Sequence, residues 1–311
     1  MSAVQAAETV QAIRVAAGSA KLLAIDPATF HEAFGRQPFP MRHNLVGHPL
    51  LQLARLVELA RQLPAHRVEY NAGNLAVNTD PKATPHTGLS VEETIRRIEE
   101  CSSWMVLKNV ELVPEYRELL HACLAAVEAL DHPAGRGITL REGFVFVSSP
   151  GAVTPYHMDP ELNFLLQVHG SKQMSVFPGS DRELLSEIEL EHFYSGAHRN
   201  MVFKEEYQQK ATVFELRPGD GLHVPVTYPH WVKVGPSYSI SFSITVMTRA
   251  LERRGTLYRI NHNLRQRGRS PRPVGQSPVR DWWRYNLHRI SARLARLWPG
   301  RPAGETTGSQ Y

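Results

Sequence analysis

The chain has 311 residues, of which 42% are hydrophobic, so the composition excludes an intrinsically disordered protein. No apolar run approaches the ~20 residues needed to span a bilayer, and residues 1–29 lack the basic start and continuous apolar core of a signal peptide. The only two cysteines, Cys101 and Cys123, fit a reducing compartment and two ordinary buried thiols. We therefore expect a cytoplasmic globular protein with one large domain or two ordinary ones.

The N-terminal part of the chain, up to the glycine-rich stretch before Thr139, predicts a mixed α and β segment. Ser90 and Glu93 form a capping box, which predicts a helix over 91–100. Apolar residues at helical spacing predict further helices over 50–63 and 114–130. Extended segments are predicted over 68–71 and 104–110, and a strand leading into a short helix over 24–30.

From residue 139 onward, short β-type runs follow one another between Gly, Pro and Ser residues. The predicted strands are 143–148, 162–169, 172–177, 212–216, 221–224 and 237–248. Regular short strands with turn signals are typical of a sandwich or a barrel. Residues 182–200 predict a helical or irregular insertion between strands.

Two side chains that can bind a metal, His157 and Asp159, stand two positions apart. In an extended strand they would point to the same face. Such a pair also occurs by chance, and a histidine is more often a core or surface residue than a ligand. A third ligand would have to come from a later strand, either from His230, with several predicted strands between it and His157, or from His223. Two histidines and one carboxylate form the facial triad of non-haem Fe(II) oxygenases, which leaves three open positions.

Three further polar residues are candidates for the same site. Lys172 follows the predicted turn Gly170–Ser171, and a lysine buried in a barrel needs an anion. Asn163 and Thr154 could face the same interior. The alternatives are an exposed strand lysine, a surface amide and a turn hydroxyl.

The segment 237–248 alternates apolar residues with Ser and Thr. One interpretation is a half-buried strand with a solvent face. The other is that the hydroxyl row, which includes Ser243, lines a polar cavity inside a small barrel.

These motifs together resemble a known family. The run Val153-Thr154-Pro155-Tyr156-His157-Met158-Asp159, followed by Asn163, Lys172 and the later segment 218–230, resembles the core of the JmjC-type, cupin-like Fe(II)/2-oxoglutarate dioxygenases. The resemblance covers about 140–248, and within the family it is nearest to the asparaginyl hydroxylase known as factor inhibiting hypoxia-inducible factor. It implies a β-rich double-stranded β-helix, a jelly-roll or cupin-like barrel with N-terminal helices.

The resemblance also implies roles for individual residues. It makes His157, Asp159 and His230 the iron ligands and favours His230 over His223, because the family places this ligand five residues after a proline, here Pro225. It implies that Thr154 and Lys172 bind the distal carboxylate of 2-oxoglutarate, with Asn163 near its iron-bound end. Ser243 stands where close family members have an asparagine. The family also uses an aromatic hydroxyl, for which Tyr156 is the nearby candidate.

The C-terminal part is strongly basic. Residues 249–301 contain 14 arginines and two acidic residues. We expect a domain over 1–248, then a basic linker and a C-terminal amphipathic helix over 249–311, with Ser277–Pro278 opening the helix. The helix carries an apolar stripe at helical spacing, composed of Trp283, Leu287, Ile290, Leu294 and Leu297.

Three interpretations of the stripe are open. It docks on this protein or on a second copy to form a homodimer, it lies on an anionic membrane surface at the inner face of a membrane, or the charge binds nucleic acid.

For the chain as a whole, the hypothesis is an oxygenase, with Fe(II), 2-oxoglutarate and O2, that hydroxylates a protein side chain, a lipid or a sugar-lipid. The alternatives are a non-catalytic cupin-like binding or regulatory protein and a JmjC-type N-methyl demethylase.

Overall fold

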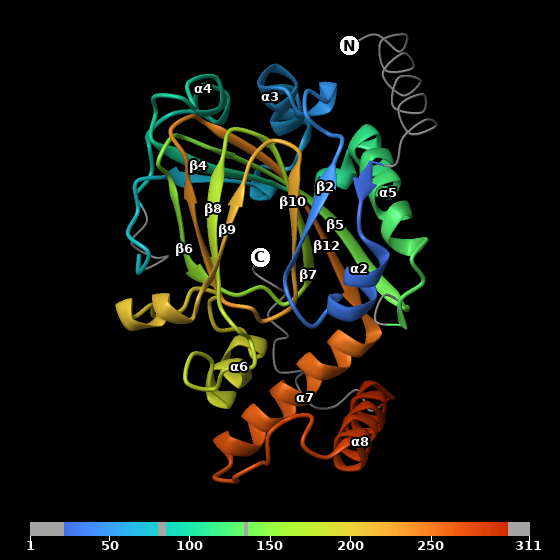
Figure 1. The fold of residues 1–311 in the computed structure, drawn as a ribbon. Helices are drawn as coiled ribbons and strands as arrows, with labels where there is room; N and C mark the ends of the chain where they lie inside the picture. The colour runs from blue at the N-terminus through green and yellow to red at the C-terminus, as the bar shows by residue number, and fades with distance from the viewer. Residues whose placement is uncertain (1–21, 80–84, 134–135, 298–311) are drawn as a thin grey trace. The chain divides into compact units, whose positions relative to one another are not determined.

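The computed structural model describes residues 22–79, 85–133 and 136–297 (Figure 1). Contacts within the chain separate two compact units. Unit 1 runs to Pro178 and resumes over Asn200–Thr248, and unit 2 comprises Gly179–Arg199 and the chain from Arg249 on. One boundary between the units falls after residue 248. The two units are described separately below.

Unit 1 contains two antiparallel sheets. The larger has eight strands in the order β1-β2-β10-β7-β12-β5-β4-β3, and the smaller has four in the order β6-β11-β8-β9. The strands are β1 (Leu23–Ala24), β2 (Phe39–His43), β3 (Val68–Ala72), β4 (Ser103–Lys108), β5 (Ile138–Ser148), β6 (Val153–His157), β7 (Leu162–His169), β8 (Lys172–Val176), β9 (Thr212–Leu216), β10 (Asp220–Val224), β11 (His230–Val234) and β12 (Ser239–Thr248).

Helices of unit 1 come mainly from the part of the chain that precedes β5, as predicted. They are α2 (Pro27–Ala33), α3 (Leu53–Gln62), α4 (Val91–Arg96) and α5 (Pro114–Glu128), with short 3-10 turns η1 (Pro49–Leu51), η2 (Ala65–Arg67), η4 (Val110–Leu112) and η6 (Glu205–Lys210). The capping box at α4 is confirmed, because Ser90 accepts from the backbone N–H of Glu93 and the Glu93 carboxylate accepts from that of Ser90. The helix is shorter than predicted and ends at Arg96.

The two sheets pack against each other through one apolar cluster. Its members come from both sheets: Leu165, Leu222 and Val224 from the larger, and Met174, Val176, Leu216 and Val232 from the smaller. Side chains alternate between the faces of a strand. The cluster therefore identifies the inner face of each sheet, and the position of any other strand residue can be judged from it.

Strand β12 lies in the middle of the larger sheet, between β7 and β5. Its apolar residues and its hydroxyl residues are both buried, so of the two interpretations left open by the sequence, the half-buried strand with a solvent face is wrong. The apolar face points away from the inner side, since a Cβ added at Gly143 would lie 3.2 Å from Phe242 and 3.2 Å from Leu120 of α5. The Ser and Thr row therefore occupies the inner face.

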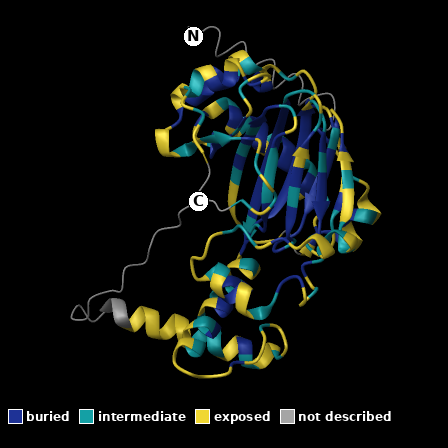
Figure 2. Ribbon diagram, turned by 90° about the vertical axis from the view of Figure 1, so that its left-hand side faces the viewer, coloured by how far each residue is buried: buried dark blue, intermediate teal, exposed yellow. Residues whose placement is uncertain are grey.

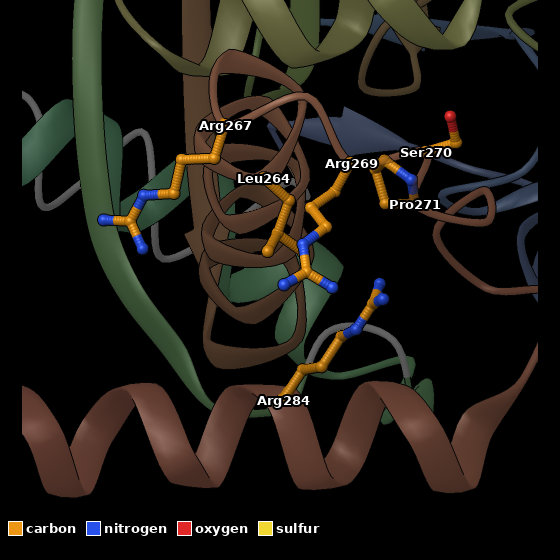
Figure 3. A pocket seen from close by; sticks show the side chains of 6 residues that line it. All are labelled: Leu264, Arg267, Arg269, Ser270, Pro271 and Arg284. Atoms are coloured by element: carbon orange, nitrogen blue, oxygen red, sulfur yellow. The ribbon is translucent and has the colours of Figure 1, made fainter.

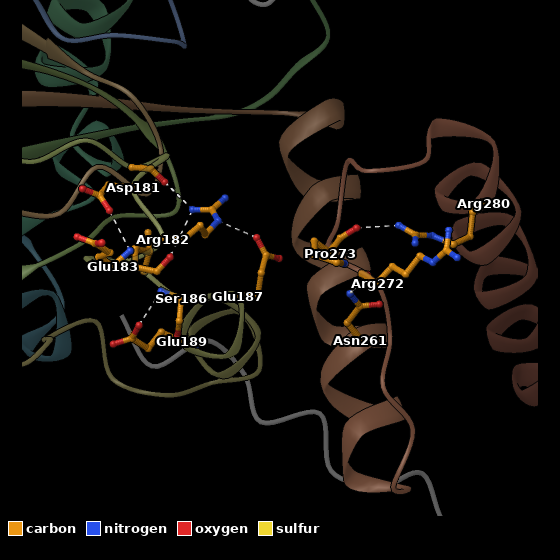
Figure 4. Close-up of polar contacts among 12 residues, drawn as sticks. Asp181, Arg182, Glu183, Ser186, Glu187, Glu189, Asn261, Arg272, Pro273 and Arg280 are labelled. Atoms are coloured by element: carbon orange, nitrogen blue, oxygen red, sulfur yellow. Dashed lines mark hydrogen bonds and ion pairs between the residues drawn. The ribbon is translucent and has the colours of Figure 1, made fainter.

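Unit 2 is helical. It contains α6 (Glu187–Tyr194), α7 (Arg249–Gln266) and α8 (Pro278–Leu297). The helix α7 was not predicted, because this stretch was assigned to a basic linker. It packs on α6, where Arg265 pairs with the buried carboxylate of Glu191 at 2.7 Å. Within the 179–199 segment, Arg182 pairs with Glu187 and Ser186 caps α6 (Figure 4).

Candidate metal centre

The three residues of the predicted triad meet in unit 1. One potential ligand atom each from His157, Asp159 and His230 lies within 4.8 Å of the others. His230 Nε2 is 3.7 Å from Asp159 Oδ2, and the two imidazole centroids are 4.2 Å apart. A separation of 3.7 Å between Nε2 and Oδ2 is too long for a hydrogen bond and suits two atoms that face one ion.

The backbone orients both imidazoles. Nδ1 of His157 lies 2.7 Å from the carbonyl of Pro155, and Nδ1 of His230 lies 2.9 Å from the carbonyl of Tyr228. A carbonyl only accepts, so each Nδ1 carries the proton and each Nε2 presents its lone pair. This is the arrangement found in metal-binding histidines, whose second nitrogen donates to a carbonyl or carboxylate.

A β-bulge shapes strand β6. His157 of β6 pairs with His230 of β11. The next pair on the same face joins Thr154 to Val232, so three positions on β6 correspond to two positions on β11. Because of the extra residue, Thr154 and His157 both lie opposite inward-facing residues of β11. The prediction that His157 and Asp159 share one extended strand is wrong, since β6 ends at His157. Asp159 approaches from the following turn, where its carbonyl accepts from the Thr227 N–H at 2.9 Å.

His223 lies on the opposite face of the larger sheet from the metal centre. Its neighbours Leu222 and Val224 belong to the inner cluster, so its own side chain points outward. There its Nδ1 lies 3.0 Å from the carbonyl of Asn163, its Nε2 accepts from the N–H of Gly35 at 3.2 Å, and three phenylalanine rings surround it. Burial lowers the pKa of this imidazole to about 3.

Lys172 is buried on the inner face of the smaller sheet, so the exposed-lysine alternative is wrong. It is 5% exposed, and its strand neighbour on the same face is Met174 of the inner cluster. Its Nζ lies 5.5 Å from the ring centroid of Phe146, and within the described parts of the chain no acidic side chain pairs with it. Burial without a partner lowers the pKa of this ammonium to about 7.

Asn163 and Ser243 lie on the inner face of the larger sheet and contact each other. The Ser243 hydroxyl donates to Asn163 Oδ1 at 2.8 Å, and both side chains are buried. Two positions earlier on β12, Ser241 donates to Gln167 Oε1 at 2.7 Å. The hydroxyl row thus forms a polar, hydrogen-bonded layer.

Tyr156 is buried on the other side of β6. Its ring packs edge-on against Phe177 and Phe203, at centroid distances of 5.1 and 5.4 Å. Sequence reasoning missed Phe146 beneath Lys172, and it also missed the carbonyls of Pro155 and Tyr228. Pro155 inside a strand was the available signal, because proline within a sheet marks a bulge or an edge.

Comparison with known proteins places this geometry in a family. Residues 62–248 match the family model described as the cupin-like domain, which is more than half of the chain. The chain belongs to the cupin-like domain family.

Curated relatives carry JmjC domains. JmjC domain-containing protein D of Dictyostelium discoideum is 30% identical over 148 residues, 44% of this chain and 31% of that protein. Jumonji C domain-containing protein 5 of Drosophila melanogaster is 34% identical over 99 residues, 30% and 25% of the two chains. Lysine-specific demethylase 8 of Xenopus tropicalis is 27% identical over 139 residues, 42% and 30% of the two. The matched part thus spans between a quarter and a third of each relative.

Solved structures confirm the predicted fold class. YcfD of Escherichia coli superimposes with a TM-score of 0.52 at 16% identity, covering 88% of this chain and 68% of that one. A second structure of YcfD, named a ribosomal oxygenase and solved with cobalt and 2-oxoglutarate, has a TM-score of 0.50 at 16% identity, with 88% and 67% covered. At this identity the likeness shows the fold: a β-rich, cupin-like barrel with flanking helices.

Proposed function

We propose that the protein is an Fe(II)- and 2-oxoglutarate-dependent oxygenase that acts as a hydroxylase. The observation that carries the proposal is the combination of two features on the inner side of the smaller sheet: a His-Asp-His cluster, and a buried lysine for which the described residues supply no counter-ion. Lysines are almost never fully buried unless paired. A dicarboxylate cosubstrate would supply the missing charge.

The residues present fit an iron ion. Imidazole and carboxylate are ligands that iron accepts, and two histidines with one carboxylate leave three positions for exogenous groups. His157 and His230 would bind through Nε2, since Nδ1 of each is engaged with a carbonyl. With Fe(II) and 2-oxoglutarate bound, reaction with O2 yields succinate and CO2 and inserts one oxygen atom into a substrate C–H bond.

The protein's own groups would bind and orient the cosubstrate. Lys172 of β8 pairs with Val234 of β11. Val234 stands four positions after His230, which corresponds to about 13 Å along the strand at the usual rise per residue. The lysine side chain and a cosubstrate with carboxylates at both ends can together bridge this distance. Thr154 would donate a hydrogen bond to the distal carboxylate, and the Asn163 amide, held by Ser243, would face the metal-bound end.

A spectroscopic titration tests the proposal. Anaerobic Fe(II) and 2-oxoglutarate should give a weak visible charge-transfer band in the intact protein and in His169→Ala, a control that removes an exposed histidine of β7. The band should be absent in His157→Ala and Asp159→Ala. An intact protein that binds Fe(II) and 2-oxoglutarate without the band, or binds neither, would leave the non-catalytic cupin-like alternative.

Demethylation is a second candidate, because one relative is named a lysine-specific demethylase. Both reactions release succinate, but only removal of an N-methyl group releases formaldehyde. We favour hydroxylation because the sequence motifs resemble those of the hydroxylases of this family and because a protein with the same fold is named a ribosomal oxygenase. A protein side chain is therefore the first substrate class to screen, by succinate release with Asp159→Ala as the blank.

A further inference from the structure

Helix α8 exposes its apolar face. Trp283 is 56% exposed, Leu287 59%, Ile290 54% and Leu294 60%. At about 100° per residue these four positions fall within one narrow stripe of the helix surface. Figure 2 shows α8 as mostly exposed along its length. The side chain of Leu297, the fifth predicted member of the stripe, is outside the described residues.

The polar side of α8 faces α7. The carboxylate of Asp281 is buried and accepts from the Gly275 N–H at 2.7 Å. Arg284 donates to Asn261 of α7 at 2.9 Å, and Arg253 of α7 lies over the ring of Tyr285. An ordinary surface helix buries its apolar stripe and exposes its polar side. In α8 this arrangement is reversed, so the stripe is available for something outside unit 2.

The stripe residues Leu287, Ile290 and Leu294 also form one wall of a groove with a cationic end. Its apolar part lies between α7 and α8 and is lined by Ile260, Leu264, Leu287, Ile290 and Leu294. At Leu264 and Arg284 it meets a hollow of about 350 Å³ that is also lined by Arg267 and Arg269. Figure 3 shows the guanidinium groups of Arg269 and Arg284 pointing toward one another, with no acidic residue among the six that line the hollow.

Within the described residues, no acidic side chain forms an ion pair with Arg267, Arg269 or Arg284, and Glu191 of the neighbouring helix α6 is already paired with Arg265. Residues 249–297 contain 13 arginines and two acids, Glu252 and Asp281. Asp281 is already paired with Arg280, whose guanidinium also donates to the carbonyl of Pro273 (Figure 4). The surface formed by the apolar stripe, the groove and the arginine hollow therefore combines exposed apolar area with free positive charge.

We propose that this surface binds anionic phospholipid bilayers, with α8 lying along the membrane. Apolar residues with Trp on one face and arginines beside them are the composition of interfacial amphipathic helices. Arg269 and Arg284 take lipid phosphates, because guanidinium groups bind phosphate oxygens in a bidentate manner. The stripe enters the boundary between headgroups and acyl chains.

Charge complementarity favours an anionic bilayer over a second copy of the chain and over a nucleic acid. A second copy pairing through the same stripe would bring arginines against arginines, with no free acid on α8 to offset the repulsion. A nucleic acid would satisfy the arginines but leave the stripe of Trp, Leu and Ile in water. Within the described residues no helix is long and apolar enough to cross a bilayer, so contact at the surface is the mode that fits.

Vesicle binding tests the proposal with the full-length protein, and it does not depend on the proposed oxygenase activity. Vesicles of phosphatidylcholine with phosphatidylglycerol as the minor component should co-sediment the protein at least tenfold more strongly than phosphatidylcholine alone, and high salt should weaken this binding.

The paired substitutions Leu287→Ser with Ile290→Ser, and Arg269→Gln with Arg284→Gln, should each reduce binding at least tenfold. Leu140→Ser and Arg136→Gln, at exposed positions of unit 1, are the matched controls and should bind like the intact protein.

Several results would overturn the proposal. These are equal binding to neutral and anionic vesicles, unchanged binding in both paired variants, or complete competition by millimolar glycerol phosphate, which would indicate a soluble phosphate ligand. A dimer by light scattering that Leu287→Ser with Ile290→Ser dissociates would assign the stripe to a second copy. Tight binding of single-stranded RNA without vesicle binding would assign the arginines to nucleic acid. Leu287, Ile290 and Arg269 are exposed, whereas Arg284 is half-buried and bonded to Asn261, so circular dichroism must first show that each variant is folded like the intact protein.

Discussion

Ser243 of β12 holds the side-chain amide of Asn163 on the adjacent strand β7 through a hydrogen bond of 2.8 Å from its hydroxyl to Oδ1. Ser243 is 1% exposed and Asn163 is 9% exposed, so water competes little for this bond. With Oδ1 engaged, the amide NH2 group is the part of Asn163 left to meet a ligand. Under the proposed function, the serine that departs from the family pattern would act through Asn163, as a positioning residue.

Removing this hydroxyl should weaken cosubstrate binding. In Ser243→Ala, Asn163 loses its orienting partner, and we expect the Kd for 2-oxoglutarate to rise about five- to tenfold, the equivalent of about 1 kcal/mol for a lost hydrogen bond. Isothermal titration calorimetry under anaerobic Fe(II) measures this, and the affinity for Fe(II) itself should stay constant. Ser241→Ala, which removes the equivalent bond to Gln167, is the control and should change the Kd less than twofold. Equal losses in both variants would mean that the hydroxyl row only stabilises the sheet.

Lys172 should make 2-oxoglutarate binding depend on pH. Its pKa is lowered to about 7 by burial, so the free protein loses the ammonium charge as pH rises above 7. Binding of the distal carboxylate favours the charged form, hence the complex takes up a proton above pH 7. We expect the Kd to be roughly tenfold or more higher at pH 8.5 than at pH 6.5, since one pKa unit corresponds to a tenfold change.

Calorimetry in two buffers of different ionisation enthalpy would measure the proton uptake directly. Lys172→Met should lose most of the affinity together with its pH dependence. Lys233→Met, at an exposed position of β11, is the control and should keep both. A Kd that is flat from pH 6.5 to 8.5 in the intact protein would show that Lys172 does not meet the carboxylate.

The turn that delivers Lys172 to the inner face requires a glycine. Gly170 lies between β7 and β8 with φ +67°, and a Cβ there would stand 2.1 Å from the carbonyl oxygen of Tyr238. Gly170→Ala should therefore lower the unfolding free energy by about 3 kcal/mol or more, because a left-handed alanine alone costs about 1–2 kcal/mol. The matched control is Gly47→Ala, with φ +75° and nothing within 4 Å of its Cβ, which carries the conformational cost without the clash.

Thermal unfolding followed by circular dichroism should rank these two variants, with at least twice the Tm loss for Gly170→Ala. The affinity for 2-oxoglutarate should fall in Gly170→Ala only, since only that turn sets the position of Lys172. Equal losses of Tm would show that the backbone around Tyr238 moves away at little cost.

Local signals in the sequence predicted most of the strands. β7 and β9 match their predicted limits, because each is a β-type run bounded by Gly, Ser, Pro or a charged loop. Strand β11 was given no range in the prediction, although His230 was expected on a later strand, because it is five residues long and only residues 225–229 separate it from β10. The partners of a strand depend on contacts distant in sequence, so the family resemblance implied only the type of barrel, and the strand order became visible in the structure.

Helix α7 shows where sequence periodicity fails. Its buried residues are Gly255, Leu257, Tyr258 and Asn261, a mixture without a continuous apolar stripe. Arginines that pair with Glu191 or lie over Tyr258 stabilise it through partners that sequence reading does not show. The bulge in β6 had one local signal, Pro155, but its register follows only from the pairing of Thr154 with Val232 of β11.

His223 should make unit 1 sensitive to acid, although it is not part of the metal centre. Its pKa is about 3 in the folded protein, whereas an unfolded histidine titrates near 6.5. Between these values the unfolded chain binds a proton that the folded protein does not, so stability is lost as pH falls from 6.5 toward 3. Going from pH 7 to pH 5, this one group should cost about 2 kcal/mol of unfolding free energy.

His223→Gln removes that titration. At pH 7 the variant should be about 1–3 kcal/mol less stable, because the contacts with Gly35 N–H and the Asn163 carbonyl are disturbed. Its further loss between pH 7 and pH 5 should be about 2 kcal/mol smaller than that of the intact protein, measured by urea unfolding at both pH values. His43, whose pKa burial also lowers, is present in both proteins and cancels from the comparison. His169→Gln, at an exposed position, should follow the intact protein, and identical pH slopes for all three proteins would show that His223 takes up its proton in the folded state.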